Sequence, residues 1–152
     1  MEGPKIGLAL GSGAAKGYAH IGVLKVFERE GIPIHLITGS SIGSLIGALY
    51  ASGVSIKMLE RLAREIKRRQ WVDLTIPKRG LIAGNKIEGI IKLLTKGKNF
   101  EELEIPLGVV ACDLTTKKSI LINSGNVAEA VRASISIPGI FQPIEKDGHI
   151  FE

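Results

Sequence analysis

Apolar runs and amphipathic stretches alternate along the first half of the chain. The apolar runs at residues 5–10 and 34–38 predict two short buried strands. Apolar side chains recur at helical spacing over residues 18–30, and residues 44–50 predict a second helix directly after the second strand. Strand, helix, strand, helix in this order is typical of right-handed βαβ units. The pattern therefore predicts an α/β fold built on a parallel sheet.

The second half of the chain adds three predicted helices and four predicted strands. The helices are expected at residues 57–70, 85–94 and 127–134, and the strands at residues 105–112, 118–123, 143–146 and 149–152. Between the last two strands, Asp147 and Gly148 form a two-residue signal for a hairpin turn. No repeat and no low-complexity linker interrupts the pattern, so we expect a single domain over residues 1–152.

Composition narrows the class of protein. The 152 residues suffice for one domain with a core, and a hydrophobic fraction of 45% is ordinary for a globular chain. Aromatic residues make up only 5%, so aliphatic side chains must build the core. Cys112 is the only cysteine, which excludes an intrachain disulfide, and its apolar neighbours predict that it is buried. No spacing of His, Cys and Asp residues indicates a metal site, and we expect no cofactor.

Charge and hydropathy bear on partners and location. A net charge of +5 is compatible with an anionic lipid surface, whereas we expect no nucleic acid partner. The first residues lack the order of a signal peptide, and no apolar stretch reaches the ~18–20 residues of a membrane span. We therefore expect a cytoplasmic protein whose contact with a membrane is at most peripheral. The basic helix at 57–70 is the candidate for that contact, but its apolar stripe favours a solvated helix packed on the core.

The turn between the second strand and its helix carries the candidate chemistry. Residues 39–43 read Gly-Ser-Ser-Ile-Gly, which fits the G-x-S-x-G pattern of a nucleophilic serine on a sharp turn. Gly39 and Gly43 allow the strained backbone and leave room for neighbouring chain. Ser41 is then placed at a helix N-terminus, where backbone N–H groups favour developing negative charge. The motif predicts acyl chemistry at Ser41, and a plain helix N-cap is the alternative interpretation.

A loop of small residues follows the first strand. It consists of Gly11, Ser12, Gly13, Ala14, Ala15, Lys16 and Gly17. Acyl transfer needs N–H donors for a tetrahedral oxyanion, and the amides of Gly13, Ala14 and Ile42 are the natural candidates. A dinucleotide loop is disfavoured because the G-x-G-x-x-G spacing is absent and the second strand ends at Thr38 rather than at an acid.

These segments together resemble the patatin-like phospholipases. Residues 5–17, 19–24, 39–43 and 133–141 occur in the order and spacing of that family. The resemblance implies a three-layer α/β/α sandwich with a mainly parallel sheet, related to the cytosolic phospholipases. It also implies hydrolysis of lipid acyl esters by a Ser–Asp dyad, with Ser41 as the nucleophile and residues 12–17 as the oxyanion-hole loop. Ser12 and Ala14 replace two glycines of the family loop, and the donor survives provided that Ala14 needs no positive φ.

The sequence does not contain the acidic partner of that dyad in its expected motif. The chain has three aspartates, Asp73, Asp113 and Asp147. The resemblance expects the catalytic Asp in an Asp-Gly-Gly or Asp-Gly-Ala motif, one strand after a hairpin turn, and Asp147-Gly148 matches the hairpin turn. The expected acid would then follow Glu152. We favour a fold truncated at its C-terminus, with an exposed sheet edge, because Asp-Gly is ordinary turn chemistry. The other interpretation is that Asp147 substitutes.

Three functions are therefore considered. The first is a hydrolase of lipid acyl esters that lacks its catalytic Asp in this chain. The second is an acyl-carrier-protein transacylase, for which no His base or Arg is marked in the sequence. The third is a catalytically dead lipid-binding module. A histidine triad is disfavoured because only His149 follows Ser41 and it is two residues from Asp147. His20 is expected to pack or hydrogen-bond near the small-residue loop, and residues 136–139 to shape a turn near the site.

Overall fold

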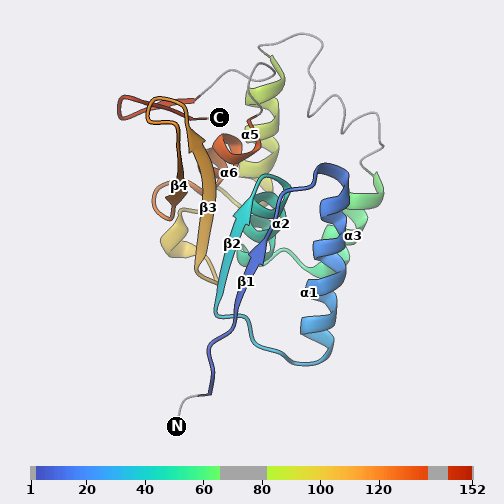
Figure 1. The fold of residues 1–152 in the computed structure, drawn as a ribbon. Coiled ribbons are helices and arrows are strands. Elements are labelled where there is room, and N and C mark those ends of the chain that lie inside the picture. Colours follow the sequence, from blue (N-terminus) through green and yellow to red (C-terminus); the bar gives the residue numbers. More distant parts are fainter. Residues whose placement is uncertain (1–2, 66–81, 137–143, 152) are drawn as a thin grey trace.

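The computed structural model describes residues 3–65, 82–136 and 144–151, and its described strands form one mixed sheet (Figure 1). The strands are β1 (Gly7–Leu10), β2 (Leu36–Ser40), β3 (Leu107–Asp113), β4 (Lys118–Ile122), β5 (Ile144–Lys146) and β6 (His149–Phe151). The α-helices are α1 (Ala19–Arg29), α2 (Ile42–Ala51), α3 (Ile56–Glu65), α5 (Ile82–Leu94) and α6 (Val127–Ile135). Two 3₁₀ turns, η1 (Ala14–Tyr18) and η2 (Phe100–Glu102), complete the described elements.

The sheet has the order β1-β2-β3-β6-β5, with β4 also paired to β3. β1, β2 and β3 are parallel neighbours, whereas β4 and β6 run antiparallel to β3. β5 is antiparallel to β6 and therefore shares the direction of the first three strands. The parallel half follows from the β1-α1-β2-α2 order, because parallel neighbours need a crossover helix. The expected α/β fold with a mainly parallel sheet is confirmed.

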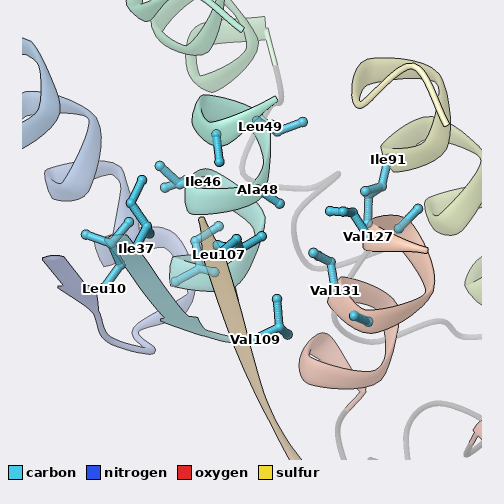
Figure 2. Packing of buried hydrophobic residues seen from close by; sticks show 14 of the residues in the cluster. Leu10, Ile37, Ile46, Ala48, Leu49, Ile91, Leu107, Val109, Val127 and Val131 are labelled. Carbon is cyan, nitrogen blue, oxygen red and sulfur yellow. The ribbon is translucent and has the colours of Figure 1, made fainter. Parts of the chain in front are cut away.

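Helix α2 is the centre of the core. It lies directly behind β1 and β2 in Figure 1, and eight of its ten residues are buried. Figure 2 shows Ile46 and Leu107 between α2 and the strands, with Val127 and Val131 of α6 on the neighbouring side. Among the described residues the buried core is aliphatic apart from Phe100, as the low aromatic content predicts. An apolar helix this short is stable because other elements cover most of its surface.

The helix boundaries follow the predicted pattern with small shifts. α2 begins at Ile42, two residues before the predicted start. β2 extends to Ser40, so Ser41 is the single residue between the strand and the helix. α5 begins at Ile82, three residues before its predicted start. Of the predicted helix at 57–70, α3 accounts for the described part, and its remainder lies outside the described residues. In α3, Leu59 is buried whereas Met58 is 42% exposed, which fits an apolar stripe packed on the core.

The prediction that Cys112 is buried is wrong, because its side chain is exposed. Successive residues of a strand point to opposite faces of the sheet. In β3, Ala111 and Asp113 point to the face that the helices cover, so Cys112 points to the other face. Leu121, which pairs with Val110 on that other face, is 57% exposed. The apolar run at residues 105–112 does not show which of its side chains point to the helix-covered face of the sheet and which to the exposed face.

The last two strands form the hairpin that the sequence predicts. Lys146 pairs with His149, and the two residues between them have positive φ, 52° at Asp147 and 79° at Gly148. Two positive φ values in a two-residue loop match the right-handed twist of antiparallel strands. In the described residues no helix is long and apolar enough to cross a membrane.

Candidate active site

Ser41 lies in a strained turn between β2 and α2. Its φ of 52° and ψ of −121° fall in a region that residues other than glycine rarely adopt. Such a conformation costs about 1–3 kcal/mol and persists only where the surroundings impose it. Ser41 is the residue before the first turn of α2, and its side chain makes no cap hydrogen bond there. A simple N-cap role therefore does not explain the serine, whose side chain is left available.

The two glycines of the motif make this turn possible by close packing. A Cβ added to Gly39 would lie 2.6 Å from the carbonyl carbon of Gly43. A Cβ added to Gly43 would overlap the carbonyl oxygen of Leu10 and lie 2.8 Å from that of Gly11. The start of α2 therefore touches the end of β1 and the first residue of the small-residue loop. Only a residue without a side chain fits at either position.

The small-residue loop departs from the expected backbone at one point. Ala14 has a φ of 47°, so the condition that it needs no positive φ is not met. Its amide remains a backbone donor, but an alanine here holds a left-handed conformation that glycine adopts at no steric cost. The loop then continues into η1, where the amide of Lys16 donates to the carbonyl oxygen of Gly13 at 3.0 Å.

Three contacts connect this loop to the rest of the candidate site. The hydroxyl oxygens of Ser12 and Ser40 are 2.8 Å apart. A Cβ added to Gly17 would lie 2.5 Å from Cγ1 of Ile42, so the end of the loop packs on the first residue of α2. Nε2 of His20 lies 2.8 Å from the carbonyl oxygen of Gly11, which confirms that His20 bonds near the loop. The loop and the Ser41 turn thus form one continuous arrangement.

Ser134 is a functional candidate that sequence analysis missed. Its hydroxyl accepts a hydrogen bond from the amide of Ser41 at 2.8 Å and donates one to the carbonyl oxygen of Val110 at 2.5 Å. Ser134 lies in the 133–141 segment of the family resemblance, which is the signal in the sequence that points to it, whereas the turn predicted near the site comprises residues 136–139. Ser136 ends α6 and bonds to Arg132 of the same helix, and residues 137–139 lie outside the described residues.

Asp113, at the end of β3, forms its hydrogen bonds in a cluster that does not include Ser41. Its carboxylate accepts hydrogen bonds from the Thr116 hydroxyl at 2.7 Å and the Thr115 amide at 2.9 Å. Nδ1 of His149 lies 2.9 Å from Oδ2, the same oxygen that accepts from Thr116, and the Asp113 side chain is 3% exposed. The Thr116 hydroxyl, followed by His149 and the amides, lowers the pKa of Asp113 to about 2, against the opposing effect of burial. This ionised carboxylate holds β6 to the end of β3.

Neither of the other two aspartates has a described contact with Ser41. Asp147 is exposed in the hairpin turn, and Asp73 lies outside the described residues. Among the described residues, no three His, Cys, Asp or Glu side chains gather where they would hold a metal ion. The described geometry thus brings together Ser41, the Ile42 amide and the small-residue loop, without an aspartate partner.

A parallel strand, a strained serine and a helix in direct succession are features of the α/β serine hydrolases. A family model described as "Patatin-like phospholipase" matches residues 8–151, and the chain belongs to this family. The family resemblance drawn from the sequence is therefore confirmed, and with it membership in a family of lipid hydrolases.

Two named relatives show how much of a longer protein the chain corresponds to. It is 37% identical over 150 residues to an uncharacterized NTE family protein of Mycobacterium tuberculosis, covering 97% of this chain and 41% of that protein. It is 36% identical over 158 residues to human patatin-like phospholipase domain-containing protein 6, covering 99% of this chain and 12% of that one. The chain therefore spans less than half the length of these relatives.

Solved structures share the fold at low sequence identity. The protein VipD from Legionella pneumophila matches 95% of this chain with a TM-score of 0.80 at 13% identity, over 44% of VipD. The type III effector ExoU matches 90% of this chain with a TM-score of 0.68 at 17% identity, over 41% of that chain. These similarities support the fold assignment alone.

Proposed function

We propose that this chain carries the nucleophile and the oxyanion donors of a lipid acyl ester hydrolase. The observation that carries the proposal is the φ of 52° at Ser41, between β2 and α2. Backbone strain of this size at a serine needs a reason, and exposing a nucleophilic hydroxyl at a helix N-terminus supplies one. The names of relatives support the substrate class, since they include the neuropathy target esterase sws of Drosophila persimilis, 36% identical over 158 residues.

The chemistry assigns a role to each part of the site. Oγ of Ser41 attacks the ester carbonyl carbon and its proton passes to a general base. The carbonyl oxygen becomes an oxyanion, for which the amides of Gly13, Ala14 and Ile42 are the donors. The tetrahedral intermediate collapses, the alcohol leaves with a proton, and the acyl group stays on Ser41. Water then cleaves the acyl-enzyme to release the fatty acid and restore the serine.

The register of β6 supports the expected position of the missing base. β4 pairs with one edge of β3 from Val109 to Asp113, so β6, which also pairs at Asp113, uses the other edge. β2 occupies that other edge up to Val110, which pairs with Ser40. Because β6 is antiparallel to β3, a strand that continued in this register would run back toward the end of β2. An acid placed directly after Glu152 would lie opposite Ala111, one pair from Ser40.

A fluorophosphonate probe tests the nucleophile. It phosphonylates an activated serine with loss of fluoride. We expect labelling of a version with Asp-Gly-Gly added after Glu152, weaker labelling of the parent chain, and loss of both signals in Ser41→Ala. Labelling that persists in Ser41→Ala would contradict the assignment. Absence of labelling with retained binding to lipid vesicles would support a catalytically dead lipid-binding module instead.

A second experiment tests the missing base. Hydrolysis of a short-chain p-nitrophenyl ester would be compared for the 152-residue chain and for versions with Asp-Gly-Gly or Asn-Gly-Gly added after Glu152. We expect the Asp version to gain activity and the Asn version to match the parent. Full activity in the parent that Asp147→Ala removes would show that Asp147 is the base.

A further inference from the structure

We propose that the hydroxyls of Ser12 and Ser40 form a clamp that positions the oxyanion-hole loop against the nucleophile. The inference rests on the proposed function, in which Ser41 attacks and the loop amides bind the oxyanion. Neither serine touches the reacting atoms in this account. Both are positioning residues, and their effect on the reaction comes through the placement of the Gly13 and Ala14 amides.

The loop has little packing to hold it in place. Residues 11–16 are all exposed, and Gly17 is the first buried residue after Leu10. The turn of η1 that begins here has no side-chain cap, since Gly13 is the residue before it. Ala14 also holds a φ of 47°, which an unrestrained alanine would leave. Exposed backbone with few apolar contacts opens easily unless polar contacts restrain it.

The two ends of the loop are fixed by contact with the start of α2. At the first end, Gly11 and Leu10 lie so close to Gly43 that no Cβ fits there. At the other end, Gly17 packs against the side chain of Ile42. The residues between these ends include the proposed donors and are all exposed. The Lys16 amide donates to the Gly13 carbonyl oxygen at 3.0 Å inside this part, so a restraint against the Ser41 turn has to come from a different contact.

The Ser12 hydroxyl supplies that restraint. Its oxygen is 2.8 Å from the hydroxyl oxygen of Ser40, and either group can be the donor. Ser40 is the last residue of β2, is paired with Val110, and directly precedes Ser41. The bond therefore runs from the residue before the proposed donors to the residue before the nucleophile. Any shift of the loop relative to Ser41 has to break it.

Such a restraint matters because oxyanion donors act only at close range. They need to lie about 2.7–3.1 Å from the position that the oxyanion occupies. A loop that is free to move presents its amides in that geometry for a smaller fraction of the time. Losing the clamp should therefore slow the chemical step while leaving substrate binding nearly unchanged, since the bond contacts no substrate.

A double-mutant cycle with the fluorophosphonate probe tests the clamp. Varying probe concentration separates the maximal rate of labelling at Ser41 from the apparent affinity. We expect Ser12→Ala and Ser40→Ala each to lower the maximal rate about three- to tenfold, the range of one hydrogen bond. The double variant should be no slower than the worse single variant, because both changes remove the same bond. Ser12→Thr keeps the hydroxyl and should retain most of the rate.

A matched control and a second measurement keep the two proposals separable. Ser119→Ala removes an exposed hydroxyl from β4 and should change nothing. Hydrogen–deuterium exchange of residues 11–17 should rise in each single variant and no further in the double variant. Unchanged exchange, or additive effects on labelling, would overturn the clamp. If neither the parent chain nor the version with Asp-Gly-Gly after Glu152 is labelled, the nucleophile proposal fails, and the exchange measurement alone decides whether the clamp exists.

Discussion

The hydroxyl of Ser134 bridges the amide of Ser41, at 2.8 Å, and the carbonyl oxygen of Val110, at 2.5 Å. The strained turn is thereby joined to α6 on one side and to β3 on the other. The amide of Ser41 belongs to a residue at a helix start, where backbone N–H groups have no partner within the helix. A side chain that lies 93 positions further along the chain satisfies it.

We predict that Ser134→Ala lowers the rate of fluorophosphonate labelling at Ser41. The change leaves the part-buried Ser41 amide without its partner, at a cost of about 1–3 kcal/mol, and frees the turn to relax. Labelling kinetics and denaturant unfolding would be measured together. Ser134→Thr keeps the hydroxyl and should restore labelling. Ser55→Ala is the matched control, because it removes the hydroxyl that caps α3 through the Met58 amide and should lower stability without slowing labelling.

We predict that Ser41→Gly stabilises the fold by about 1 kcal/mol, whereas Ser41→Ala does not. Glycine adopts a φ of 52° at no steric cost, while alanine keeps the strain of the serine. Both variants lose labelling. The free energy of unfolding from denaturant titration, at unchanged slope, is the measurement. Equal stability of the two variants would mean that the turn stores no strain.

We predict opposite effects of glycine-to-alanine changes at two positions. Gly43→Ala should cost about 3 kcal/mol or more, because its Cβ would overlap the carbonyl oxygen of Leu10. Gly22→Ala, on the exposed face of α1, meets nothing within 4 Å and should stabilise the protein by about 0.5–1 kcal/mol. Thermal and denaturant unfolding would measure both. A tolerated alanine at position 43 would contradict the close packing of α2 on β1.

We predict a loss of stability in acid that depends on Asp113. Its pKa falls from 3.8 in the unfolded chain to about 2 in the folded one. A lowered pKa means that the stabilisation is complete above about pH 4 and is lost as the pH falls toward 2. Asp113→Asn should flatten the pH dependence of the unfolding free energy in that window. Asp147→Asn, in the exposed hairpin turn, should keep the parent dependence, and equal slopes in all three proteins would exclude Asp113 as the source.

Local features of this protein could be predicted from the order of its residues. The alternation of apolar runs and amphipathic stretches located the helices and strands within a few residues, because periodicity records which side chains face the core. The spacing of residues 39–43 located the Ser41 turn, since only glycine fits beside it. Asp147 and Gly148 located the hairpin turn, because a two-residue loop requires positive φ. Each of these depends on neighbours close along the chain.

Contacts between distant segments could not be predicted in this way, because they depend on how the elements pack. Ser134 reaches Ser41 because α6 packs beside α2 against β3, a contact that the spacing of residues along the chain does not predict. Asp113 finds His149 through the pairing of β3 with β6. Cys112 is exposed because the pleat of β3 points its side chain away from the helices. A continuous apolar run in the sequence does not show which side chains point to which face of the sheet. Local pattern fixes which residues form an element, whereas packing and register fix which side chains meet.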